Sequence, residues 1–100
     1  MPDPKTVVLF ARGEPMRSTV EASIDSAGNL TIAGCDAGDL VREMWGHDDY
    51  EYTLTVPAAD KDRLLLALLA QHYGDNSEAF AAIRRLLEQH SVPHRFDSWP

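Results

Sequence analysis

Apolar and polar residues alternate along three stretches of the chain, and a fourth stretch is compact and strongly apolar; together they predict four β-strands. In the clearest of them, aromatic and aliphatic residues at every second position from Tyr50 to Val56 alternate with glutamate and threonine. This period of two gives a strand one buried face and one wet face. The other three predicted strands are Lys5 to Arg12, Ser18 to Asp25, and Leu30 to Cys35. The turn residues from Ser26 to Asn29 predict that the second and third strands form a hairpin.

Three further stretches have the spacing of amphipathic helices. Asp36 is a suitable N-cap for a short helix that runs to Trp45. A main helix follows Pro57 and runs to Tyr73, with a left-handed stop at Gly74. A third helix is predicted before Pro93, with Asp75 and Glu78 in a capping arrangement. Its buried face consists of Phe80, Ile83, Leu86 and Leu87, and that of the main helix of Leu64, Leu65, Leu68 and Leu69.

The order β-β-β-α-β-α-α predicts an α+β protein in which three helices pack on one face of an antiparallel sheet. The segment from His94 to Trp99 is either a further strand or a tail that packs Phe96 and Trp99 on the core, so the sheet has four or five strands. With 100 residues, the chain is expected to form a single globular domain, residues 1–100.

The composition indicates the environment of the protein more clearly than its function. A hydrophobic content of 44% and a charged content of 25% are ordinary for a soluble globular protein. Cys35 is the only cysteine, so no intramolecular disulfide can form. The sequence from Met1 to Pro4 has no feature of a signal peptide, and no apolar run is long enough to span a bilayer. We therefore expect a cytoplasmic protein with no membrane association.

The net charge of −7 is concentrated in one segment. Eight acidic residues lie between Asp36 and Asp62, against only Arg42 and Lys61. Such a segment repels phosphate backbones and attracts basic surfaces. Binding to nucleic acid is therefore disfavoured, and a basic protein partner is one interpretation; the other is that the acidic surface only keeps the protein in solution.

No established catalytic or metal-binding motif is present. The cluster His47-Asp48-Asp49 could bind a divalent ion or act as acid and base, but its spacing matches no known loop, and a solvated turn explains it as well. Of the other histidines, His90 and His94 are separated by Pro93, which prevents them from sharing a helix face. Cys35 would need a base held beside it to act as a nucleophile. We therefore predict a non-enzymatic protein with no cofactor and no metal.

Aromatic residues surrounded by carboxylates are the strongest candidate for a binding surface. Tyrosine and tryptophan contribute much of the energy of protein interfaces. The opposing interpretation is that Tyr50, Tyr52 and Trp45 pack inward, on the main helix. The predicted partner-binding residues are Glu43, Trp45, Asp48, Asp49, Tyr50 and Glu51.

The chain also resembles a group of small, largely uncharacterised bacterial α+β proteins. The residues that carry the resemblance are Gly28-Asn29-Leu30, Gly34 to Gly38, the run from Trp45 to Val56 with its Tyr50-Glu51-Tyr52 motif, the Leu64 to Leu69 helix and Phe96-Asp97-Ser98-Trp99. Where the group has a G-D-S-x-Y-E-Y-like turn, this chain has His47-Asp48-Asp49. In size and charge the chain is also similar to immunity proteins of bacterial toxin systems, which implies a protein-binding role. The alternatives are a self-associating module, such as a homodimer, and a small ligand-binding protein or enzyme with its site near His47.

Overall fold

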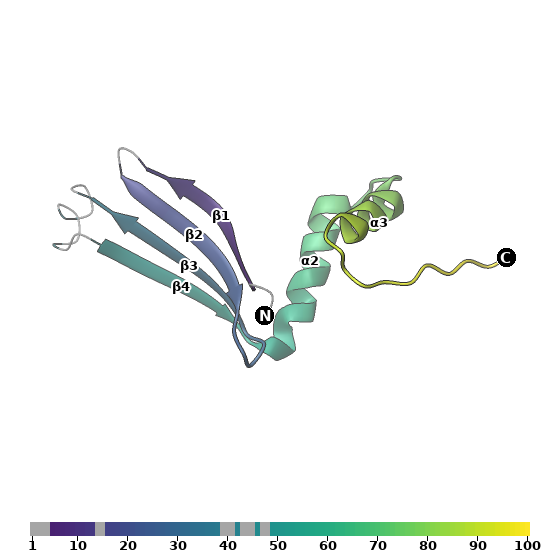
Figure 1. The fold of residues 1–100 in the computed structure, drawn as a ribbon, viewed down its shortest axis with the longest axis horizontal. Helices are drawn as coiled ribbons and strands as arrows, with labels where there is room; N and C mark the ends of the chain where they lie inside the picture. Colours follow the sequence, from purple (N-terminus) through teal and green to yellow (C-terminus); the bar gives the residue numbers. More distant parts are fainter. Residues whose placement is uncertain (1–4, 14–15, 39–41, 43–45, 47–48) are drawn as a thin grey trace. The chain divides into compact units, whose positions relative to one another are not determined.

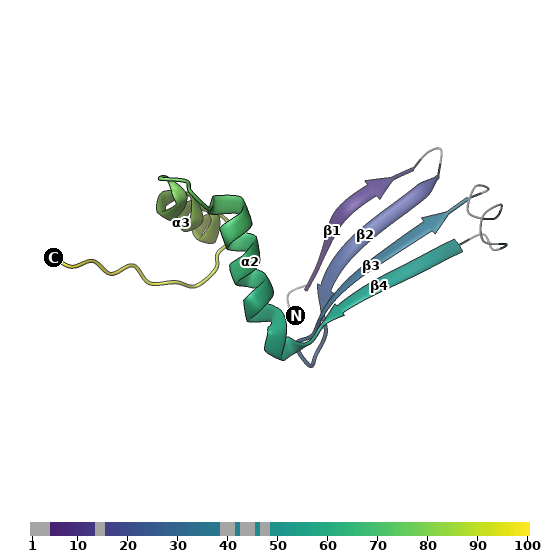
Figure 2. The same ribbon diagram turned by 180° about the vertical axis from the view of Figure 1, so that it is seen from behind.

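Four strands form one antiparallel sheet in which each strand pairs with its neighbour in the sequence, in the order β1-β2-β3-β4 (Figures 1 and 2). The computed structural model describes residues 5–13, 16–38, 42, 46 and 49–100. Polar and apolar side chains alternate most regularly from Tyr50 to Val56, a pattern that suits a pleated sheet. The strands are β1 (Thr6–Arg12), β2 (Arg17–Ile24), β3 (Leu30–Ala37) and β4 (Asp49–Val56). All four predicted strands are therefore confirmed.

The turn between β2 and β3 is organised by the side chains of Asp25 and Asn29. One carboxylate oxygen of Asp25 accepts the backbone N–H groups of Ala27 and Asn29, both at 2.9 Å. These hydrogen bonds, that from the Asn29 backbone foremost, hold the pKa of Asp25 below its ordinary value. Gly28 has a φ of +86°, a conformation that glycine adopts without steric cost. The predicted hairpin is thus confirmed.

A β-bulge interrupts the pairing of the edge strand β1. Val8 pairs with Glu21 and Phe10 with Val20, which leaves Leu9 as an extra residue. An extra residue bends and twists an edge strand, and a twisted edge is a poor template for pairing with another chain. The bulge therefore offsets part of the aggregation risk of this apolar strand.

The helices follow the sheet in the sequence. Pro57, which has no N–H to donate, lies between β4 and a 3₁₀ turn, η1 (Ala58–Asp60). The turn leads directly into α2 (Lys61–Tyr73), and α3 (Ala79–Gln89) follows after a short connection. The two longer predicted helices are confirmed, and the chain is an α+β protein.

The connection between α2 and α3 differs from its prediction. The Gly74 N–H still bonds the Ala70 carbonyl at 2.8 Å, as in a continuing helix. The left-handed residue is therefore Asp75, with a φ of 62°, since aspartate tolerates this conformation better than most residues. The predicted capping by Asp75 and Glu78 is also wrong, because Glu78 makes no side-chain capping bond and its N–H instead bonds the Asn76 side chain at 2.9 Å.

The short helix predicted from Asp36 to Trp45 needs correction at its start. The described residues contain four strands, within the predicted four or five, and two α-helices, one fewer than predicted. Asp36, the predicted N-cap of a helix to Trp45, belongs to β3, which continues to Ala37 because its pairing with β2 extends that far. The rest of that helix lies largely outside the described residues. The segment 94–99 forms no strand.

The chain divides into two compact units, Met1–Leu64 and Leu65–Pro100. The first contains the sheet, and the second contains most of α2, α3 and the C-terminal segment. Packing of the helices on one face of the sheet, within a single domain, stays a prediction. No helix among the described residues is long and apolar enough to cross a membrane.

Candidate functional site: the polar face of the sheet

The register of the sheet separates its side chains into two chemically distinct faces. Val20 pairs with Gly34, which pairs with Tyr52, so these three positions form one row across the sheet. Neighbouring rows point to opposite sides because successive residues of a strand alternate. The apolar face contains Val20, Ala22 and Ile24 of β2, Leu30 and Ile32 of β3, and Tyr50, Tyr52, Leu54 and Val56 of β4. The polar face contains Arg17, Thr19, Glu21, Ser23, Thr31, Ala33, Cys35, Asp49, Glu51, Thr53 and Thr55.

A hollow of about 320 Å³ lies on the polar face, across β2, β3 and β4. Two rows of the sheet form it: Thr19 with Cys35 and Glu51, and Glu21 with Ala33 and Thr53. Strand β3 contributes only small side chains to the hollow, whereas β2 and β4 each contribute a threonine and a glutamate. The two carboxylates therefore lie diagonally across a floor of small residues.

The charge around this hollow is negative. Asp49 pairs with Ala37 in the row beyond Glu51, and it lies on the same face as the hollow. Burial raises the pKa of the Cys35 thiol above its ordinary value of 9.0, and the negative charges of Asp49 and Glu51 raise this pKa further. Arg17 acts in the opposite direction but has a smaller effect on the Cys35 pKa than these carboxylates. The thiol therefore reports a negative potential on this face.

Neutralising both carboxylates in an Asp49→Asn/Glu51→Gln variant should make Cys35 more reactive. The Cys35 pKa falls when the charges that oppose thiolate formation are removed, although the effect of burial stays. We expect the rate of alkylation by neutral iodoacetamide at pH 8 to rise by about two- to fivefold at low salt. A Glu78→Gln variant, changed in the other unit, should react at the unchanged rate. Equal rates in all three proteins would contradict the negative potential.

On the apolar face, Tyr52 covers the backbone of β3. A Cβ atom added at Gly34 would overlap the Tyr52 ring, so the ring lies directly on the glycine. The Tyr52 hydroxyl donates a long hydrogen bond to the Asp36 carboxylate, with an O···O distance of 3.4 Å. Tyr50 lies beside it, with ring centroids 5.5 Å apart. The two tyrosines thus stabilise the junction between β3 and β4.

The Tyr52 phenol should ionise at a higher pH than an ordinary tyrosine. Burial, the charge of Asp36 and the hydrogen bond to Asp36 all raise the pKa of Tyr52 above 10.0. A raised pKa favours the neutral phenol in the folded state, so its contribution to stability is complete below the pKa of an unfolded tyrosine. It is lost as the pH rises through the Tyr52 pKa. Absorbance titration of tyrosinate should show this transition at lower pH in Asp36→Asn, whereas Asp49→Asn, on the other face, should shift it less.

The predicted binding residues do not gather on one side of the sheet. Asp49 and Glu51 lie on the polar face, and Tyr50 lies on the apolar face. Glu43, Trp45 and Asp48 lie outside the described residues, as does His47. The pattern of β2 indicates that Glu21 faces away from Val20, but only the pairing of β3 with both neighbours brings Glu21 and Thr19 near Glu51. The turn residues predict the pairing of β2 with β3, but the pairing of β3 with β4 has no signal in the local sequence.

A raised pKa keeps the Cys35 thiol protonated, whereas a nucleophile needs the thiolate. Among the residues in ranges 5–13, 16–38 and 49–100, with 42 and 46, no three His, Cys, Asp or Glu side chains are arranged to hold a metal ion. The polar face thus presents hydroxyls, the carboxylates of Glu21, Asp49 and Glu51, and one cation, Arg17.

Comparisons of the chain with models of protein families, with curated protein sequences and with solved structures found no match. The resemblance to small bacterial proteins and to immunity proteins stays a prediction. The chemistry of the two faces is therefore the basis for assigning a function.

Proposed function

We propose that this protein is a non-enzymatic binding module that recognises a basic protein surface through the polar face of its sheet. The observation that supports this proposal is the hollow of about 320 Å³ between Glu21 and Glu51. Its floor of small side chains leaves room for a lysine or arginine side chain. An arginine in this position would meet a carboxylate on either side, and guanidinium–carboxylate pairs are strong, directional contacts.

Electrostatics favours such a partner at long range as well as on contact. A net charge of −7 attracts a basic protein and speeds its association, particularly at low ionic strength. The same charge disfavours nucleic acid, because phosphate groups would be repelled. An immunity-type protein, which covers a basic surface of a toxin, would use this arrangement, and this role is the specific form of our proposal.

Charge reversal on the polar face tests the proposal. A Glu21→Lys/Glu51→Lys variant should lose most of its affinity for a basic protein captured from cell lysate with the native chain at low salt. A matched variant, Asp62→Lys/Glu78→Lys, has the same net charge but leaves the polar face intact, so it should retain the same partner. Affinity for the purified partner should also weaken with added salt. Equal loss in both variants would show that only net charge matters and would contradict a site on this face.

Self-association is a second candidate function, and the edges of the sheet favour it. Within the described part of the chain, β1 and β4 each pair with a neighbour on one side only. Such edges offer backbone N–H and C=O groups to a second copy, although the bulge at Leu9 opposes pairing along β1. Pairing along β4 would give a homodimer of two chains, each with a mass of 11.1 kDa. Light scattering that gives a monomer mass at high protein concentration would exclude it.

A further inference from the structure

The C-terminal segment is held against α3 by the side chain of Phe96. Its ring makes an edge contact with the Phe80 ring, at a centroid distance of 6.0 Å. The guanidinium of Arg84 lies over the Phe96 ring, 4.6 Å from its centroid. Aromatic and cation–π contacts of this kind fix the position of a ring as well as adding stability. The tail is therefore placed on α3 at one defined point, within the Leu65–Pro100 unit.

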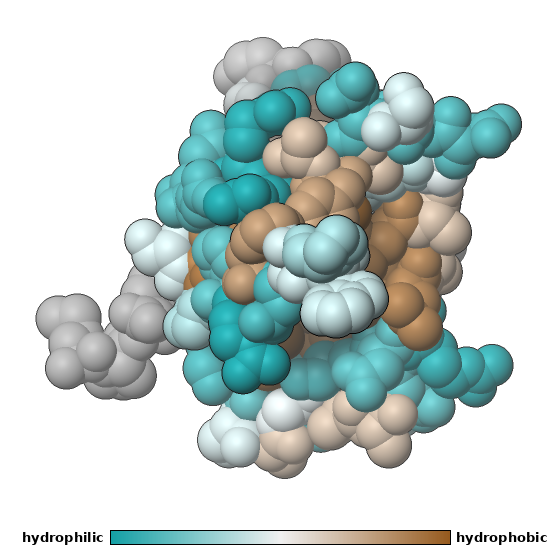
Figure 3. Space-filling model, turned by 90° about the vertical axis from the view of Figure 1, so that its right-hand side faces the viewer, coloured by the Kyte–Doolittle hydropathy of each residue, from teal (hydrophilic) through white to brown (hydrophobic). Residues whose placement is uncertain are grey.

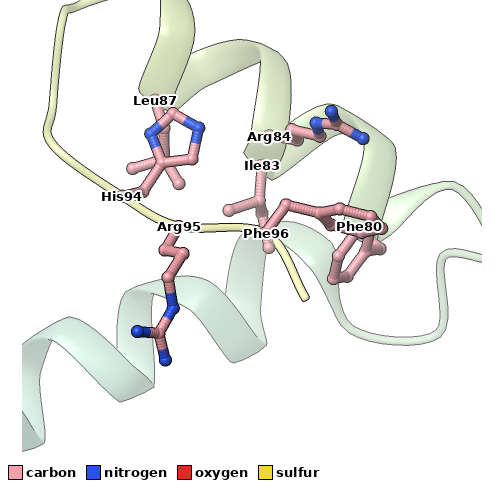
Figure 4. A pocket seen from close by; sticks show the side chains of 7 residues that line it. All are labelled: Phe80, Ile83, Arg84, Leu87, His94, Arg95 and Phe96. Carbon is pink, nitrogen blue, oxygen red and sulfur yellow. The ribbon is translucent and has the colours of Figure 1, made fainter. Parts of the chain in front are cut away.

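A hollow of about 160 Å³ lies between this tail and α3 (Figure 4). Its apolar lining consists of Phe80, Ile83, Leu87 and Phe96. An engineered cavity of about 150 Å³ with the same kinds of side chain binds benzene. In Figure 3, apolar residues, drawn brown, are exposed among hydrophilic residues, drawn teal. The volume and lining of the hollow therefore suit one aromatic ring.

The ionisable side chains that line the hollow are all basic. They are Arg84, Arg95 and His94, and no described acidic residue lines the hollow. Both arginines form ion pairs outside it, Arg84 with Glu88 at 3.3 Å and Arg95 with Asp97 at 2.9 Å. Each ion pair uses the Nε atom of the arginine. Because a guanidinium has five N–H donors, its terminal amino groups can still bind an anion.

We propose that this hollow binds a small aromatic carboxylate. The ring of the ligand would contact the apolar lining, and its carboxylate would pair with Arg84 or Arg95. Charge complementarity carries the assignment, since the charged side chains that line the hollow are all basic. This site is separate from the polar face of the sheet and does not depend on the function proposed for that face.

Titration of the full-length protein with benzoate, followed by NMR chemical shifts, tests the proposal. We expect saturable shifts at Ile83, Leu87 and Phe96, with a Kd of about 1 mM, the range of a small ligand in an open site. Benzyl alcohol, which has a similar shape but no charge, should bind at least about fivefold more weakly, because it makes no charge-assisted hydrogen bond.

Matched variants separate the cationic rim from the general charge of the helix. Arg84→Gln/Arg95→Gln should weaken benzoate binding by about tenfold or more, the expected loss of a charge-assisted contact. Arg85→Gln, next to Arg84 but outside the hollow, should leave the affinity unchanged. Arg84→Lys/Arg95→Lys keeps both charges and should retain most of the affinity for benzoate. It is the control for a loss of affinity in Arg84→Gln/Arg95→Gln that comes only from a disturbed tail.

Three results would overturn the assignment. The first is equal binding of benzoate, benzyl alcohol and benzylammonium, since the rim would then select no charge. The second is a loss of benzoate affinity in Arg85→Gln as large as the loss in Arg84→Gln/Arg95→Gln. The third is that benzoate causes no chemical shift changes at the hollow. If a peptide ending in phenylalanine binds there when benzoate does not, the hollow is a peptide site and the assignment is wrong.

Discussion

Replacement of Gly34 by valine should lower the free energy of unfolding by about 2–4 kcal/mol, the cost of overfilling a packed site. Valine normally favours a β-strand over glycine, so intrinsic propensity predicts the opposite sign. The steric effect should dominate because a Cβ atom at Gly34 would overlap the Tyr52 ring. Displacing this ring would also break the hydrogen bond from Tyr52 to Asp36. Urea denaturation, followed by tryptophan fluorescence or circular dichroism, measures the change.

Two variants test the cause of this loss. Ala33→Val makes a comparable change at the next residue of β3, on the opposite face, and should alter stability by less than about 0.5 kcal/mol, as is usual for an exposed site. In a Gly34→Val/Tyr52→Ala double variant, the overlap is removed, so the two effects should be clearly less than additive. Strict additivity, or a Gly34→Val protein as stable as the parent, would contradict the role of the glycine.

Replacement of Asn29 by alanine should cost about 1–2 kcal/mol, which corresponds to the net loss of two hydrogen bonds. Asn29 is the last residue of the turn between β2 and β3. Its side-chain oxygen accepts the Ala58 N–H at 2.9 Å, and its side-chain NH₂ donates to Asp25 at 3.3 Å. The variant therefore disconnects the turn from the start of η1. Chemical denaturation gives the size of the loss, and hydrogen exchange at Ala58 should become faster.

Ser26→Ala is the control for this prediction, since it changes the same exposed turn at a residue with no described side-chain hydrogen bond. Its stability should stay close to that of the parent. If Asn29→Ala leaves the exchange of the Ala58 amide unchanged, the hydrogen bond between the turn and η1 contributes nothing measurable in solution.

Local patterns were sufficient to predict the strands and the two longer helices. The alternation from Tyr50 to Val56 gave β4, because a strand with two different faces imposes that period. The bulge at Leu9 had no such signal, since all of its neighbours are apolar. The change from Gly74 to Asp75 as the left-handed residue depends on one additional backbone hydrogen bond, which a sequence pattern does not specify.

The candidate site was harder to predict than the fold because it depends on pairing between distant segments. Asp49, Tyr50 and Glu51 are adjacent in the sequence, and this adjacency suggested a common surface. Adjacent residues of a strand nevertheless point to opposite faces, so Tyr50 is separated from the two acidic residues. The approach of Glu21 to Glu51 requires the register of three strands, and the link from β3 to β4 passes through residues outside the described part of the chain.

The strictly sequential strand order has a consequence for how the sheet can assemble. Because every strand pairs with its neighbour in the sequence, the contacts of the sheet are local, and local contacts are associated with fast folding. The sheet can grow one hairpin at a time, with no distant segment required to begin. The bond between Asn29 and Ala58 spans 29 residues, so it can form only after β4 has joined the sheet. This hydrogen bond would therefore form late in folding, and its loss would mainly increase the rate of unfolding.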